Sequence, residues 1–191
     1  MARPEEILEF WFGRPGDEGY GKPRQEWFGV AEAFDDEVRR RFAEDFERAA
    51  DGGLTEWEET PEGSLALILL LDQCSSILYR GSTRAFATDE RGRQVARKAI
   101  ERGFDKRFPD VHRWFFYLPF EHGENLADQE RSVELFSSLE PTDANKFALD
   151  YAVRHKRVID RFGRFPNRNA GLGRESTPEE LEFLAGPDAP F

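Results

Sequence analysis

Residues 64–79, with the sequence SLALILLLDQCSSILY, decide the fold. Apolar side chains fill nearly every position in the first two helical turns of this stretch, and Gly81 follows its end. This pattern predicts a helix that is buried on all sides at the centre of an assembly of helices. Asp72 and Gln73 lie within it and need polar partners, because an unpaired carboxylate or amide is costly to bury.

The rest of the chain also favours helices. Val, Ile and Thr together supply 18 of the 191 residues, whereas Ala and Leu supply 34, so strand-forming residues are scarce. Apolar residues recur at a spacing of three or four, which is the helical period. Helices are expected over residues 5–12, 31–49, 64–79, 89–101, 110–118, 125–139 and 144–162, with a last short helix that begins after Thr177.

These elements predict an all-α fold of about seven or eight helices, arranged as antiparallel neighbours because the connections between them are short. The length of the chain fits a single all-helical domain over residues 1–191. A Gly/Pro-rich loop is expected near residues 13–23. Pro119 should end the helix before it, because proline cannot donate the next backbone hydrogen bond. Thr177 should cap the last helix.

Charge and cysteine content disfavour several classes of function. The chain carries 38 acidic and 27 basic residues, a net charge of −11, which repels nucleic acids and anionic membranes. Cys74 is the only cysteine, so neither an internal disulfide nor a cysteine-based zinc site can form. The three histidines lack the local spacing of metal ligands. We therefore expect no structural metal and no cofactor.

The sequence also predicts where the protein resides. Its longest apolar run, residues 65–71, is far shorter than the ~20 residues that span a bilayer. The first residues lack the basic and then apolar order of a signal peptide. We expect a cytoplasmic protein that does not associate with membranes.

The histidines are the first candidates for a site. His122 and Glu124 enclose one glycine, a spacing similar to the His-x-Glu of zinc deaminases, but the cysteine pair which that chemistry requires is absent. The alternative is that both residues satisfy backbone groups at a break between helices. His155 lies on the apolar stripe of its helix, either as a hydrogen-bonded core residue or, beside a second polar group, as part of a functional site. Asp72 and Gln73 are the candidates for that second group.

Asp72 is expected to be buried and paired with a cation from another helix, either Arg80 or one of the later arginines. Such a pair either ties two helices together or contributes to a catalytic site. Cys74 follows Gln73 and has no neighbouring histidine in the sequence. It is therefore interpreted as a small buried residue rather than a nucleophile.

Residues 156–174 form the basic segment of the chain, with six basic residues against one acid, a local charge of +5. The sequence RFPNRN at residues 164–169 offers guanidinium groups and backbone amides that suit a carboxylate or a phosphate. We expect this segment to form an anion-binding wall, with Arg164 as the first binding residue and Arg168 as the second. Arg161 lies on a more exposed stripe, where pairing with acids contributes little. The alternative is a solvated surface whose arginines pair with Asp and Glu.

A further set of motifs extends along nearly the whole chain. They are EILEFWF (6–12), LLDQ (70–73), YRG (79–81), RAFATD (84–89), FYLPFEH (116–122), DQERSV (128–133) and RFGRFP (161–166), followed by Arg168 and Asn169. Together they resemble a bacterial family catalogued as domain of unknown function family 924. The resemblance implies an all-helical fold similar to tetratricopeptide-like helical arrays, and it implies no established activity.

The chain departs from the pattern of that family at two places. Where the family continues Asp-Gln with Phe-Pro-Arg-Asn, residues 74–77 are CSSI (Cys74-Ser75-Ser76-Ile77), which removes an arginine and an asparagine from beside Asp72. Where the family has a histidine in the last motif, this chain has Asn167, which removes an acid/base or metal-binding group. Both departures predict a degenerate or altered site.

Two functions fit these observations. The first is the binding of a small anionic ligand, with or without catalysis, in a polar cleft between helices. The second is a helical interaction module that binds a protein or a peptide in a groove. The sequence assigns neither catalytic residues nor an oligomeric state. The ligand-binding residues expected for the first function are Asp72, Gln73, Arg80, His122, Glu124, Gln129, His155, Arg161, Arg164 and Arg168.

Overall fold

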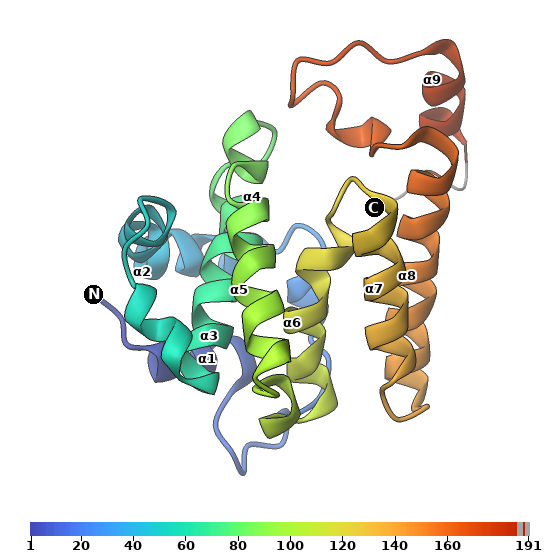
Figure 1. The fold of residues 1–191 in the computed structure, drawn as a ribbon. Coiled ribbons are helices and arrows are strands. Elements are labelled where there is room, and N and C mark those ends of the chain that lie inside the picture. The colour runs from blue at the N-terminus through green and yellow to red at the C-terminus, as the bar shows by residue number, and fades with distance from the viewer. Residues whose placement is uncertain (187–188, 190–191) are drawn as a thin grey trace. The chain divides into compact units, whose positions relative to one another are not determined.

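The computed structural model of the chain describes residues 1–186 and 189. Helices joined by short loops account for the fold of these residues, and no strand occurs among them (Figure 1). The predicted all-α helical array is therefore confirmed. The α-helices are α1 (Pro4–Phe12), α2 (Glu32–Ala50), α3 (Pro61–Ile68), α4 (Ser75–Leu78), α5 (Asp89–Glu101), α6 (Asp110–Glu121), α7 (Leu126–Ser137), α8 (Asp143–Phe162) and α9 (Pro178–Ala185). The shorter elements are η1 (Gln25–Trp27), η2 (Thr55–Glu59), the π-helical η3 (Leu69–Cys74), η4 (Thr83–Phe86), η5 (Asp105–Arg107) and η6 (Pro166–Arg168).

Contacts within the chain divide it into two compact units. Unit 1 comprises residues 1–80 and 84–119, and unit 2 comprises residues 81–83 and the described residues from 120 onward. The expectation of a single domain over residues 1–191 remains a prediction.

The centre of unit 1 is the stretch that opened the sequence analysis. There α3, η3 and α4 follow one another without a break, and α1, α2 and α5 pack around them (Figure 1). Every residue from Leu65 to Leu71 is at most 1% exposed. The prediction of burial on all sides is confirmed for residues 65–71, whereas Ser76, later in the stretch, is exposed.

The predicted α-helix over residues 64–79 is interrupted by the π-helical element η3. A π-turn spaces its backbone hydrogen bonds more widely than an α-turn, so nearby carbonyl groups need other donors. Hydroxyl groups supply them. The carbonyls of Leu71, Asp72 and Gln73 accept hydrogen bonds from the hydroxyls of Thr88, Ser75 and Ser76 at 2.6, 3.0 and 2.9 Å. The CSSI sequence at residues 74–77 thus contributes two of the hydroxyls beside the π-turn.

An aromatic cluster joins α1 to the rest of unit 1. Trp11 and Phe12 of α1 are buried, and the chain after the loop at residues 13–23 brings in Trp27, whose Nε1 donates to the carbonyl of Trp11 at 3.2 Å. His112 of α6 stacks on Phe12 with 3.9 Å between ring centroids. Burial lowers the pKa of His112 to about 4, and its Nδ1 has no hydrogen-bond partner.

The helix α6 continues through Pro119 and ends at Glu121. The prediction that Pro119 ends the helix after residue 118 is therefore wrong. The physical reason is the position of the proline: close to the end of the helix, its missing N–H removes only one backbone hydrogen bond. Within unit 1, the carbonyl of Pro119 accepts a hydrogen bond from Arg93 Nη1 at 3.4 Å.

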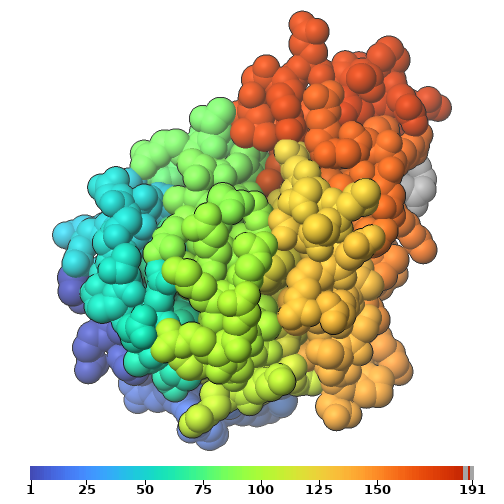
Figure 2. Space-filling model, viewed as in Figure 1, coloured from blue at the N-terminus to red at the C-terminus, as the bar shows by residue number. Residues whose placement is uncertain are grey.

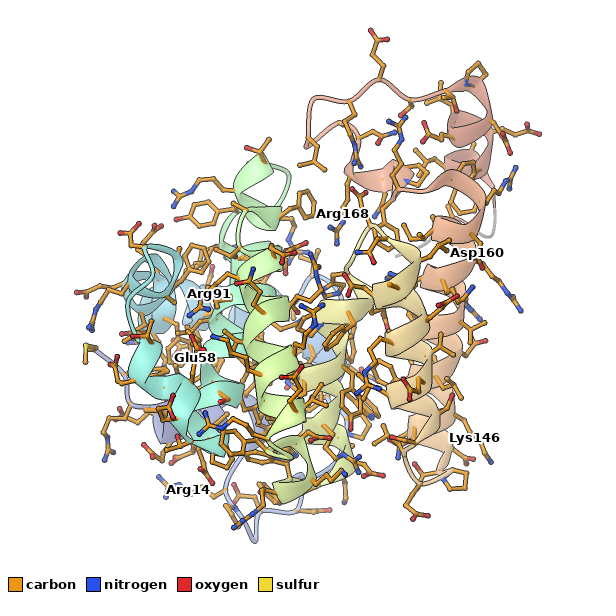
Figure 3. The ribbon with its side chains drawn as sticks, in the orientation of Figure 1. Arg14, Glu58, Arg91, Lys146, Asp160 and Arg168 are labelled. Atoms are coloured by element: carbon orange, nitrogen blue, oxygen red, sulfur yellow. The ribbon has the colours of Figure 1, made fainter. Side chains whose placement is uncertain are left out.

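Glu58 joins η2 to the basic face of α5. Its carboxylate binds the guanidinium of Arg91, beside it in Figure 3, and accepts from Lys98 Nζ at 3.0 Å, while its carbonyl accepts from Arg102 at 2.9 Å. Burial by itself would raise the pKa of Glu58, but the hydrogen bonds from Lys98 and Arg91 outweigh it and hold the pKa below its usual value. Glu58 therefore stays ionised and anchors α5 within unit 1.

In unit 2, α7 and α8 pack side by side as an antiparallel pair (Figure 1). Asn125 caps α7 by accepting from the amide of Asp128, and Thr142 caps α8 by accepting from the amide of Asn145. Gly163 ends α8 with a φ of 69°, a left-handed conformation that glycine adopts without strain. These caps fix where the basic segment leaves the helix.

His112 should make the stability of the protein depend on pH. Its pKa of about 4 in the fold lies below the ordinary value of 6.5, so the neutral ring contributes stability above pH 6.5 that is lost as the pH falls toward 4. In His112→Phe the aromatic contact remains and the titration is removed. Both proteins should become less stable when the pH is lowered from about 7 to about 4.5. The free energy of unfolding, measured by urea denaturation, should fall by about 2 kcal/mol less in the variant than in the wild type.

The comparison isolates His112, because the other histidines are present in both proteins. Equal losses of stability on acidification of the two proteins would contradict the role given to this ring.

Candidate functional site

The residues predicted to bind a ligand are divided between the two units. In each unit, the side chains meet partners that the sequence alone did not identify. Unit 1 holds Asp72, Gln73 and Arg80. Unit 2 holds His122, Glu124, Gln129, His155, Arg161, Arg164 and Arg168.

Asp72 and Gln73 lie in η3 and are 3% and 8% exposed. Gln73 Nε2 donates to Asp72 Oδ2 at 2.6 Å. The helix α5 passes close to this point, since a Cβ atom added to Gly92 would lie 3.7 Å from the Cβ of Asp72. The expected burial of Asp72 is confirmed, and the neighbouring amide is one of its polar partners.

Arg80 pairs with Asp35 of α2. Its Nη2 lies 2.9 Å from Asp35 Oδ2, and the Asp35 side chain is only 3% exposed. Of the two partners expected for Asp72, Arg80 is therefore wrong, and the alternative of a later arginine stays a prediction. The reason is that α4 ends at Leu78. Arg80 lies beyond the helical stretch that contains Asp72, so helical spacing does not predict where its side chain lies.

Three arginines in the C-terminal part of unit 2 each face a glutamate of the same unit. The pairs are Arg161 with Glu179, Arg164 with Glu180, and Arg174 with Glu124, at 2.9, 2.7 and 2.7 Å. The pairs of Arg164 and Arg174 each use two nitrogens of the guanidinium group and both carboxylate oxygens. Arg164 thus holds a carboxylate in two places, as its chemistry predicts, and that carboxylate belongs to its own chain.

Glu124 connects the loop after α6 to the loop after α8. Besides both bonds from Arg174, its Oε1 accepts from the backbone amide of Phe165 at 2.7 Å. Arg174 also donates to the carbonyl of Phe165 at 3.1 Å and to Asn169 Oδ1 at 2.9 Å. Burial by itself would raise the pKa of Glu124, but the hydrogen bonds from Arg174 and Phe165 outweigh it and hold the pKa below its usual value. Glu124 therefore stays ionised and positions Phe165.

His155 of α8 lies beside Glu121. Its Nδ1 is 2.9 Å from the carbonyl oxygen of Tyr151 and 3.0 Å from Glu121 Oε1. Burial lowers the pKa of His155 to about 3, so the ring is neutral near pH 7. Both of these neighbouring oxygen atoms accept hydrogen bonds, so Nδ1 carries the proton of the neutral ring. The lone pair of the ring is then on Nε2. Glu121, which the sequence analysis did not select, is the second polar group beside His155.

His155, Glu121 and three further residues form what we call the histidine cluster. The ring centroid of His122 lies 6.4 Å from that of His155, and Phe165 meets His155 edge-on at 5.5 Å. The guanidinium of Arg168, labelled in Figure 3, lies 5.0 Å from the centre of the Phe165 ring. After burial, the charges of His122 and Arg168 also lower the pKa of His155. The imidazole of His155 therefore lies within the electrostatic influence of both His122 and Arg168.

Gln129 closes the C-terminal end of α6. Its Nε2 donates to the carbonyls of Glu121 at 2.6 Å, Gly123 at 2.8 Å and Phe120 at 3.5 Å. Carbonyls at the end of a helix lack partners within the helix, so a buried end needs such a donor. Gln129 is 0% exposed, and neither its Oε1 nor Ser132 Oγ has a hydrogen-bond partner. This geometry gives Gln129 a structural role.

Other features of the described residues bear on the predicted chemistry. Among residues 1–186 and 189, no group of three His, Cys, Asp or Glu side chains lies together as metal ligands. Within the same part of the chain, no helix combines the length and the apolar character that crossing a membrane requires. Burial raises the pKa of the Cys74 thiol above its usual range, which disfavours the reactive thiolate.

A model of the family described as bacterial protein of unknown function, DUF924, matches residues 7–188. The chain belongs to this family. The DUF924 protein is also similar to a solved structure, described as a protein of unknown function, ATU0120, from Agrobacterium tumefaciens, with a TM-score of 0.83 and 39% sequence identity. The match covers 95% of this chain and 96% of that chain. A comparison with curated proteins finds no match. The resemblance seen in the motifs is confirmed, and neither description names an activity.

Two substitutions in α7 test the role of Gln129. Gln129→Ala removes the donor for the carbonyls at the end of α6, so it should lower the free energy of unfolding by about 2–4 kcal/mol. Ser132→Ala is the matched control, because it removes a buried hydroxyl without a partner and should change that free energy by less than about 1 kcal/mol. Urea denaturation measures both. Similar losses in the two variants would show that Gln129 is not the cap.

Proposed function

We propose that this DUF924 protein binds a small anionic ligand at the histidine cluster of unit 2. The observation that carries the proposal is the distribution of charge along the basic segment and just after it. Three arginines there each bind a glutamate of the same unit, so carboxylates of the protein itself already bind their guanidinium groups. Arg168 stacks on Phe165, and its charge acts on both His155 and Glu124.

The electrostatics of the cluster support an anion as the ligand. Although the Glu121 carboxylate lies 3.0 Å from Nδ1 of His155, the Arg168 guanidinium brings a positive charge to the same ring in a chain whose net charge is −11. A local potential of that sign attracts an oxyanion from solution. The planar guanidinium of Arg168 matches the two oxygens of a carboxylate or a phosphate. Phe165 beneath it provides an apolar wall that holds the fork in place.

The state of His155 narrows the class of ligand. The contacts of His155 place its proton on Nδ1 and its lone pair on Nε2, and the proposal assigns that lone pair a hydrogen bond from the ligand. A ligand that places a hydroxyl next to its anionic group supplies a donor to this nitrogen and an anion to Arg168. Small hydroxy acids and hydrogen phosphate have this arrangement. The proposed ligand therefore carries one anionic group with an adjacent O–H.

The same geometry favours binding over acid–base catalysis. A general base works best with a pKa near the pH at which it operates. Burial holds the pKa of His155 at about 3, so the ring accepts a proton poorly at neutral pH. Its proposed role is therefore to accept a hydrogen bond from the ligand.

Thermal unfolding in the presence of inorganic phosphate or lactate tests this proposal. The ligand is added at concentrations well above its dissociation constant. The melting temperature of the wild type should then be about 3–6 °C higher than in sodium chloride solution of the same ionic strength. Arg168→Lys should lose most of this rise, because a point charge does not replace a planar fork.

Arg161→Lys is the matched control, because Arg161 lies in an exposed pair with Glu179. It should keep the full rise. Equal rises in the wild type, Arg168→Lys and Arg161→Lys would mean that the anions act by general screening, and the proposal would fail.

A further inference from the structure

The helix α9 is attached to unit 2 by a buried carboxylate. Glu180 is 2% exposed and is the only buried residue of α9, all of which the structure describes. Its neighbour Leu181 is 57% exposed, and Phe183 packs against Phe162 with 5.1 Å between ring centroids while remaining only partly buried. In Figure 2 the red atoms of this segment lie over the orange end of α8. Polar contacts therefore dominate the attachment of this helix.

Four hydrogen bonds converge on the carboxylate of Glu180. Arg164 Nε donates to Oε1 at 2.7 Å. Oε2 accepts from Arg164 Nη2 at 2.9 Å, from the backbone amide of Thr177 at 2.7 Å and from Asn169 Nδ2 at 3.2 Å. The bond from Thr177 belongs to the capping box of α9 itself, so we give the name carboxylate cradle to the three donors outside this helix, from Arg164 and Asn169. A buried anion held by four donors is the arrangement found in oxyanion-binding sites.

Other parts of unit 2 orient the donors of the cradle. Arg164 Nη2 also donates to the carbonyl of Glu175 at 3.0 Å. Asn169 Oδ1 accepts from Arg174 Nε at 2.9 Å, which turns the amide nitrogen of Asn169 toward Glu180. Arg174 in turn is held by Glu124. Arg164 and Asn169 therefore have fixed positions that do not depend on α9.

We propose that the carboxylate cradle is an oxyanion-binding site that α9 occupies with Glu180, so that α9 is a latch released by a competing carboxylate or phosphate. The guanidinium fork of Arg164 accepts any group with two adjacent anionic oxygens, and the cradle does not require that the group belong to α9. The apolar contribution of α9 is small, because Leu181 is exposed and Phe183 is only partly buried.

The latch responds to anions and not to mild acid. The bonds from Arg164 and Thr177 hold the pKa of Glu180 at about 2, so its charge persists through the range of pH in a cell. This proposal is separate from ligand binding at the histidine cluster, because the two sites share no side chain.

Chemical rescue tests the cradle. Glu180→Ala empties it and should lower the melting temperature, and acetate should then restore more than half of the loss relative to sodium chloride at equal ionic strength. Glu179→Ala is the matched control: it removes the adjacent, exposed partner of Arg161 but leaves Glu180 in the cradle, so acetate should restore none of its loss of melting temperature. Glu180→Ala combined with Arg164→Lys should lose the rescue. Equal effects of acetate on Glu180→Ala and Glu179→Ala would overturn the proposal.

Hydrogen exchange of the wild type tests the latch without any substitution. Inorganic phosphate should increase amide exchange over residues 178–185 and leave the exchange of α7 unchanged, whereas sodium chloride at equal ionic strength should have no effect. Unchanged exchange in α9 at high phosphate would overturn the release of the latch. Arg168→Lys should not alter this result, so failure at the histidine cluster and failure of the latch are distinguishable.

Discussion

The carboxylates of Glu124 and Glu180 hold together the C-terminal part of unit 2. Each accepts a two-point bond from an arginine and a further bond from a backbone amide. Without such partners, the guanidinium groups of this segment would repel one another, and α9 would keep the exposed pair of Glu179 with Arg161 and a partly buried aromatic contact. The position of Phe165 depends on the first of these carboxylates, since Glu124 binds its amide and Arg174 binds its carbonyl.

This constraint determines what the basic segment is able to bind. A run of arginines with a local charge of +5 suggests a wall open to any anion, but internal carboxylates hold much of that charge. The proposed ligand site depends on the ring that Glu124 positions, because both His155 and Arg168 pack against Phe165. The fold thus separates Arg164, which binds the carboxylate of Glu180, from a cluster in which the charge of Arg168 acts on a neutral imidazole.

Local rules account for most of the fold, and distant pairings account for what the sequence did not predict. The helix over residues 89–101 matches α5 in full, because period and end signals depend on residues a few positions apart. Two local features were missed: α6 continues through Pro119, which lies close to the end of that helix, and the π-helical Leu69–Cys74 interrupts a stretch whose apolar pattern predicts a regular α-helix. The bidentate grip of Arg164 followed from its chemistry, but its partner Glu180 did not, because the sequence offers many glutamates and only the fold selects one.

A double-mutant cycle between Glu124 and Arg174 measures how strongly this pair holds together the C-terminal part of unit 2. Glu124→Gln, Arg174→Met and the double variant each give a free energy of unfolding, and the cycle isolates the coupling between the two side chains. If this pair organises the C-terminal part of unit 2, the coupling should exceed about 1.5 kcal/mol. A coupling below about 0.5 kcal/mol, the range of an exposed surface pair, would contradict the account.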